Sequence, residues 1–198
     1  MKSNVYKITN SMANLEDILG ESEKVAVYNA LDHKQTLQLR LLCEELGGML
    51  PNLAENFDGD LWIEFENGVC KINASIQLPA IGFSKKKEFI DISKSKKNSA
   101  TLGIGSRIRT AIEGFFLNEN VPNSCYVQTG TTYLSTGYFD GMDYSYFWSL
   151  EQYKNNKEGS EADAWDELEK SVISSVADDL VFGIKGKTVD IVIVKKFA

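Results

Sequence analysis

The segment Asp32 to Pro51, DHKQTLQLRLLCEELGGMLP, constrains the fold most strongly, because its spacing predicts an amphipathic helix over residues 33–50. Asp32 precedes this helix and can accept hydrogen bonds from the free N–H groups of its first turn. Four apolar residues recur at spacings of three and four and therefore share one side: Leu39, Leu42, Leu46 and Met49. We predict that this side faces the core.

Two adjacent carboxylates, Glu44 and Glu45, lie near the end of the predicted helix. Arg40 precedes Glu44 by one turn, where an i, i+4 ion pair would orient the carboxylate. Glu45 projects about 100° further round, nearer the apolar side, so water reaches it less easily. The pair is a candidate site, although the spacing alone favours the simpler interpretation that both residues rim an ordinary amphipathic helix.

Gly47 and Gly48 follow directly. Each glycine destabilises a helix interior by about 1 kcal/mol relative to alanine, so two together need a reason. A helix end, or a close approach by backbone or ligand, would supply one.

The order of segments, a short strand at 4–8, a helix at 14–31 and then this helix, resembles the start of the histidine-kinase-like (GHKL) ATPase superfamily, in its anti-sigma-factor and serine-kinase branch. The N box of that branch has a glutamate followed four positions later by an asparagine that holds magnesium. Glu45 falls on the glutamate and Met49 on the asparagine. The resemblance therefore implies ATP as a ligand, but a thioether is a poor ligand for magnesium, which prefers oxygen.

A β-hairpin is predicted for 60–66 and 69–78, because both segments alternate and Asn67-Gly68 between them is a strong turn signal. In the resembling family this hairpin leads to an Asp-x-Gly-x-Gly motif whose aspartate accepts from the adenine amino group. The corresponding stretch here, SIQLPAIG at 75–82, has no aspartate. A second ligand of the family is therefore missing.

A second candidate region, TLGIGSRI, lies at 101–108, after a lysine-rich run that ends at Lys97. Gly103 and Gly105 precede a predicted helix at 106–117, and N–H groups at a helix start attract anions. This region resembles the glycine box of the ATP lid, and an ordinary loop-to-helix turn is the alternative. The candidate nucleotide-binding residues are Glu44, Glu45, Met49, Lys97, Asn98, Gly103, Gly105, Ser106 and Arg107, with Glu45 as the candidate catalytic residue and no metal ligand assigned.

Composition excludes several classes of protein. A chain of 198 residues, 43% of them hydrophobic, suits one domain with one core. A net charge of −7 argues against nucleic-acid binding, and the sequence has neither a long apolar run nor a signal-like start, so we expect a cytoplasmic protein without a membrane contact. The single histidine, His33, makes a Ser-His-Asp or Cys-His enzyme improbable, and the odd, widely spaced cysteines support no disulfide framework.

The remaining segments complete the predicted fold. Residues 118–160 form an insertion that is rich in aromatic and turn residues and contains the strand-like YSYFWSL. A helix is predicted at 161–177, and Lys185-Gly186-Lys187 joins two closing strands, the last of them apolar enough to be central.

We therefore predict an α+β fold, a two-layer α/β sandwich of the Bergerat ATPase type. A mixed, mostly antiparallel sheet of about five strands would carry the helices at 14–31, 33–50 and 106–117 on one face. The resemblance implies an ATP-binding regulatory domain with weak or absent catalysis and a protein partner in a regulatory pathway. The alternative is a non-catalytic protein–protein interaction module on the same fold.

Overall fold

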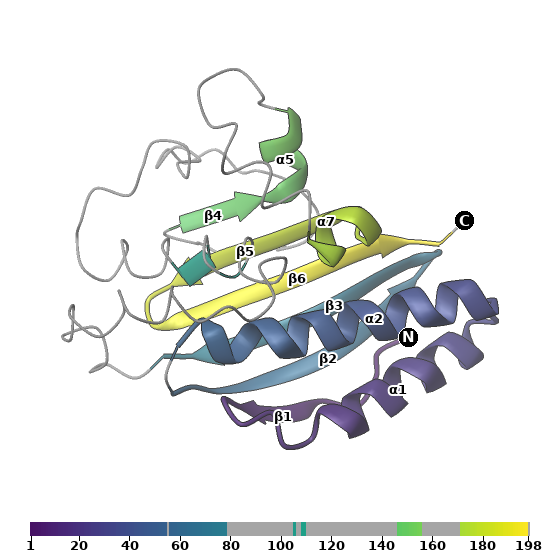
Figure 1. The fold of residues 1–198 in the computed structure, drawn as a ribbon, viewed down its shortest axis with the longest axis horizontal. Helices are drawn as coiled ribbons and strands as arrows, with labels where there is room; N and C mark the ends of the chain where they lie inside the picture. Colours follow the sequence, from purple (N-terminus) through teal and green to yellow (C-terminus); the bar gives the residue numbers. More distant parts are fainter. Residues whose placement is uncertain (55, 79–104, 106–107, 110–145, 156–170, 198) are drawn as a thin grey trace.

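The computed structural model describes residues 1–54, 56–78, 105, 108–109, 146–155 and 171–197 (Figure 1). The helical elements are α1 (Leu15–Tyr28), α2 (His33–Met49), the 3-10 turn η1 (Leu50–Asn52), α5 (Leu150–Asn155) and α7 (Val172–Val176). The strands are β1 (Tyr6–Thr9), β2 (Asp58–Glu66), β3 (Val69–Gln77), β4 (Tyr146–Ser149), β5 (Asp179–Lys185) and β6 (Thr188–Lys196). The chain is thus an α+β protein.

One sheet contains all six strands in the order β1-β2-β3-β6-β5-β4. Every neighbouring pair is antiparallel, so among the described residues the sheet is wholly antiparallel where a mixed, mostly antiparallel one was predicted, and it has six strands where about five were predicted. The difference has a simple cause. The sheet joins two hairpins, β2–β3 and β5–β6, through an antiparallel contact between β3 and β6, and β4 from the predicted insertion extends the far edge.

Turn residues fix the register of both hairpins. Asn67 and Gly68 have φ angles of 50° and 77°, the left-handed values that a two-residue hairpin turn requires. Gly186 has φ 59° in the β5–β6 turn. The prediction that the last strand is central is confirmed, because β6 pairs with β3 on one side and β5 on the other.

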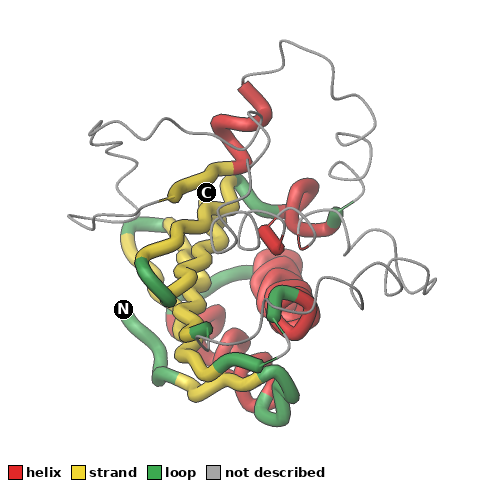
Figure 2. Tube along the Cα trace, turned by 90° about the vertical axis from the view of Figure 1, so that its left-hand side faces the viewer, coloured by secondary structure: helices red, strands yellow, loops and turns green. Residues whose placement is uncertain are grey.

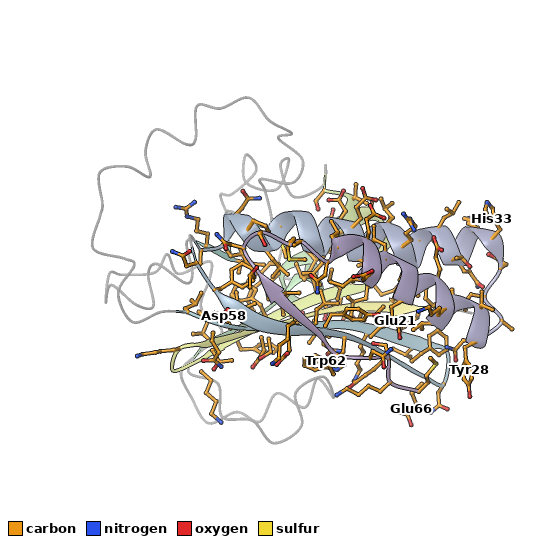
Figure 3. All side chains as sticks on the ribbon, turned by 90° about the horizontal axis from the view of Figure 1, so that it is seen from below. Glu21, Tyr28, His33, Asp58, Trp62 and Glu66 are labelled. Atoms are coloured by element: carbon orange, nitrogen blue, oxygen red, sulfur yellow. The ribbon has the colours of Figure 1, made fainter. Side chains whose placement is uncertain are left out.

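The helices α1 and α2 cover one face of the sheet (Figures 1 and 2). Alternate residues of β2, namely Leu61, Ile63 and Phe65, are buried toward them. The four residues of the predicted α2 stripe are 0–1% exposed, which confirms that this side of the helix faces the core. The other face of β2 is more polar: Trp62 lies away from the helices, with the Lys2 ammonium 4.6 Å above its ring (Figure 3).

The turn between α1 and α2 sets where α1 ends and where α2 begins. Ala30 has φ 54°, a left-handed conformation that stops α1 at Tyr28 rather than at the predicted residue 31. Asp32 then caps α2 as predicted: its side chain accepts from the Gln35 N–H at 2.7 Å, and the Gln35 side chain accepts from the Asp32 N–H at 2.9 Å.

Two predicted helices are described only in part. Residues 105, 108 and 109 are helical, while 110–117 lie outside the described residues. The helix predicted at 161–177 is represented by α7, and 161–170 lie outside as well. Most of the predicted insertion also lies outside.

Candidate functional site

The C-terminal end of α2 carries the carboxylates predicted as a site. Glu44 is exposed and Glu45 is half-buried, which confirms the expected order of solvation. Met49, one turn after Glu45, is only 1% exposed and belongs to the hydrophobic core. Glu44 is thus in contact with water, Glu45 lies at the edge of the core, and Met49 lies inside it.

Two causes act on the pKa of Glu45. Burial raises the pKa of Glu45, and the negative charge of neighbouring Glu44 raises it further. The C-terminal end of a helix also carries partial negative charge, which disfavours anions there. A carboxylate that holds its proton more tightly is a stronger base.

Gly105 brings the second candidate region to the same place. It is buried and helical, and a Cβ atom added to it would stand 3.3 Å from Met49 Cγ. Ile108, 0% exposed, anchors this segment in the core three residues later. Two candidate residues far apart in sequence, Met49 and Gly105, therefore lie side by side.

Other candidate residues cannot be placed in this site. Lys97, Asn98, Gly103, Ser106 and Arg107 lie outside the described residues.

The predicted ion pair between Arg40 and Glu44 is wrong. Arg40 instead binds Glu23 of α1 and lies 3.9 Å from Glu16. The reason is tertiary: α1 packs beside α2, so carboxylates on the neighbouring helix reach the guanidinium.

The two glycines of α2 have different surroundings. A Cβ atom on Gly47 would stand 2.6 Å from Leu15 Cδ1, so the missing side chain permits close contact with the start of α1. Gly48 is exposed, and no atom of the described residues lies within 4 Å of the position its Cβ would take. The predicted close approach thus explains Gly47. At Gly48, whose carbonyl accepts from the Asn52 side chain at 2.9 Å, no described residue lies near the position of a Cβ atom.

Two buried carboxylates lie elsewhere and were missed by the sequence analysis. Glu21 of α1 accepts from the Asn4 N–H and the Tyr6 hydroxyl and pairs with Lys24. Burial tends to raise its pKa, but these hydrogen bonds and the nearby ammonium bring the pKa below its usual value. The signal was its position between Ile18 and Val25, on the buried side of α1.

Asp179 is the other buried carboxylate, 2% exposed at the start of β5. It accepts from Ser149 Oγ at 3.1 Å, from the Glu151 N–H at 2.9 Å and from the Leu180 N–H at 2.8 Å. It thereby joins β5 to the β4–α5 junction. Burial raises its pKa despite these donors.

The cysteines and the histidine in the described part of the chain do not form an alternative site. Cys43 and Cys70 are buried, and burial raises the pKa of both thiols, that of Cys70 to about 12, so neither is a ready nucleophile. His33 lies exposed at the opposite end of α2 from Glu45 (Figure 3). Among the described residues, no three His, Cys, Asp or Glu side chains come together as a metal site would require.

Comparisons with protein-family models, with curated proteins and with solved structures found no match to this chain. In the part of the chain that the structure describes, no helix has both the length and the apolar character needed to cross a membrane.

Proposed function

We propose that this chain is a regulatory domain of the histidine-kinase-like ATPase type that binds a nucleotide at the C-terminal end of α2 with little or no turnover. The order of elements supports this, because β1, α1, α2 and a first hairpin precede a closing hairpin, as the resemblance implies. The observation that carries the proposal is the proximity of Gly105 to Met49. It joins the region proposed to bind phosphate to the helix that carries Glu45.

Glu45 and Met49 have different roles in the proposed site. Glu45, with its raised pKa, would hold or activate a water molecule beside the phosphates. Phosphoryl transfer depends on positioning and on neutralising the phosphate charge, usually with magnesium. Met49 is a buried thioether and supplies no oxygen ligand, so we expect binding without efficient transfer.

One observation favours a second candidate, a non-catalytic interaction module. Met49 is 1% exposed and packs against Gly105, so apolar contacts fill the position where the resemblance places a metal ligand. In that case the nucleotide site has been replaced by core, and the surface of the domain carries the function.

Isothermal titration calorimetry with ATP, in magnesium and in EDTA, separates the two candidates. If nucleotide binds, magnesium should improve the affinity less than tenfold, or about 1.4 kcal/mol. Glu45→Gln should strengthen binding, because it removes a negative charge from beside the phosphates. Glu44→Gln is the matched control and should change the affinity less than twofold, because Glu44 is exposed and its charge is screened.

The absence of binding up to millimolar ATP would refute the nucleotide proposal and leave the interaction module. A tenfold or larger gain with magnesium would mean that another residue supplies the metal ligand.

A further inference from the structure

The outward side of α2 carries a stripe that no other described element covers completely. Each residue of a helix is rotated by about 100° around the axis from the one before it. On that basis the side chains of the stripe point within about 80° of one another, on the side opposite the buried Leu39 and Leu46. Leu37 is 51% exposed and Leu41 is half-buried. The stripe consists of Lys34, Leu37, Leu41, Glu44 and Gly48.

The charges of this stripe oppose the helix dipole. Lys34 lies in the first turn of α2, where negative charge is preferred, and Glu44 lies near its end, where positive charge is preferred. The first turn has no acidic residue and the last turn no basic one. Neither Lys34 nor Glu44 forms an ion pair with any residue in the described ranges. Both charges are therefore available to a partner.

The pattern is symmetrical about position 39. Lys34 and Glu44 are equally far from it on either side, and so are Leu37 and Leu41. A second α2, laid antiparallel on the first, would set each lysine opposite the partner's glutamate. The two leucines would meet their counterparts between these charges. This is the self-complementarity that an isologous two-fold interface requires.

We propose that a second copy of this chain docks on the stripe, with the two α2 helices antiparallel and the two-fold axis at the level of residue 39. The unfavourable charges of the monomer then become two intermolecular ion pairs flanking a leucine contact.

Gly48 fits this arrangement. In the antiparallel pair it stands opposite the turn between α1 and α2 of the second copy, near Ala30. The open space above Gly48 lets that turn approach closely. Dimerisation thus gives a reason for a glycine at a position where no described residue approaches the place of a Cβ atom.

The stripe shares Glu44 with the candidate nucleotide-binding residues, but its other members, including Lys34 and Leu37, are not among them. Glu45 and Met49 point about 60–100° further round the helix than Gly48, toward Gly105. Dimer formation and nucleotide binding can therefore fail independently in experiment.

The size and chemistry of the interface determine how the dimer should behave. Residues 34–48 span about 21 Å of helix, so one helix pair buries less area than a standard stable interface. Association should therefore depend on concentration in the micromolar range. It should weaken in 0.5 M salt, because the flanking ion pairs are near the surface.

Sedimentation equilibrium over about 5–500 μM protein tests the proposal by charge reversal. Lys34→Glu and Glu44→Lys should each weaken self-association at least tenfold, because each variant places like charges opposite one another. An equimolar mixture of the two variants should form heterodimers, since every cross-contact again joins opposite charges. The double variant Lys34→Glu/Glu44→Lys should recover self-association.

Two further variants complete the design. Leu37→Lys should abolish the dimer by placing two buried ammonium groups at its centre. Lys187→Glu makes the same charge change in the exposed β5–β6 turn and should leave association unchanged. Circular dichroism checks that each variant is folded, which is expected because Lys34, Leu37, Glu44 and Lys187 are exposed.

A wild-type chain that remains monomeric throughout this range would overturn the proposal. Association that Leu37→Lys leaves intact would also overturn it, as would a mixture of the two charge variants that behaves as two separate monomers.

Discussion

The two glycines of α2 provide a matched pair of substitutions in one helix turn. Replacing either with alanine removes the backbone penalty of glycine, a gain of about 1 kcal/mol in the free energy of unfolding. Gly48→Ala should realise that gain, because its methyl group meets nothing within 4 Å. Gly47→Ala should not, because its methyl group would stand 2.6 Å from Leu15 Cδ1.

The cost at Gly47 follows from its surroundings. Overpacking a core usually costs about 1–3 kcal/mol. Leu15 is half-buried and contacts Gly47 with the tip of a flexible side chain, so about 1–2 kcal/mol is expected, which cancels or exceeds the propensity gain. Gly48→Ala should therefore be more stable than Gly47→Ala by about 1–2 kcal/mol.

Thermal unfolding followed by circular dichroism measures this difference. For a chain of this size it corresponds to about 2–8 °C in Tm. The protein should be kept at low micromolar concentration, so that self-association through the α2 stripe adds nothing. Equal stabilisation by both substitutions would refute the reasoning, since it would show that α1 does not approach α2 at Gly47.

Three further predictions concern single carboxylates. Asp32→Ala should lower the free energy of unfolding by about 1 kcal/mol in urea titrations, because the cap of α2 is lost. Asp32→Asn should retain most of this stabilisation, because asparagine also caps helices. The pKa of Glu21 is lower in the folded protein than in the unfolded chain. Its charged form therefore stabilises the fold above the unfolded pKa of about 4, and this stabilisation is lost as pH falls. Wild type should lose stability relative to Glu21→Gln between about pH 5 and 2. The pKa of Asp179 is higher in the folded protein than in the unfolded chain. Its protonated form therefore stabilises the fold below the unfolded pKa of about 4, and this stabilisation is lost as pH rises through the folded pKa. Relative to Asp179→Asn, wild type should therefore lose stability from about pH 4 upward. Urea unfolding at a series of pH values measures how the free energy of unfolding, relative to each variant, changes with pH. A change of the same sign for Glu21 and Asp179 would contradict the opposite directions of their pKa shifts.

Local sequence signals predicted the elements that local chemistry determines. The capping residue Asp32, the apolar stripe of α2 and the Asn67-Gly68 turn all appear as expected. Each depends on residues within a few positions of one another. The buried side of a helix and the turn of a hairpin are therefore readable from one sequence.

Tertiary contacts decided the features that the sequence analysis missed. Arg40 had a candidate partner one turn away on its own helix but pairs with Glu23, because the packing of α1 against α2 is not visible in local spacing. The sixth strand, β4, was recognised as an extended segment, but its place beside β5 depends on pairing between residues such as Ser149 and Val181, which are far apart in the sequence. In the candidate site, the exposure of Glu44 and Glu45 followed from helix geometry. The contact between Met49 and Gly105 did not.

The central position of β6 has a consequence for the time course of folding. Gln77 at the end of β3 meets its partner Thr188 only after 111 further residues. At a synthesis rate of about 5–20 residues per second, the β2–β3 hairpin waits roughly 6–20 s for the strand that completes it. During that interval one edge of β3 is unpaired, and Ile72 and Ile76 lack the β6 neighbours that flank them in the finished sheet. The nascent chain is therefore most exposed to misassociation before β6 arrives.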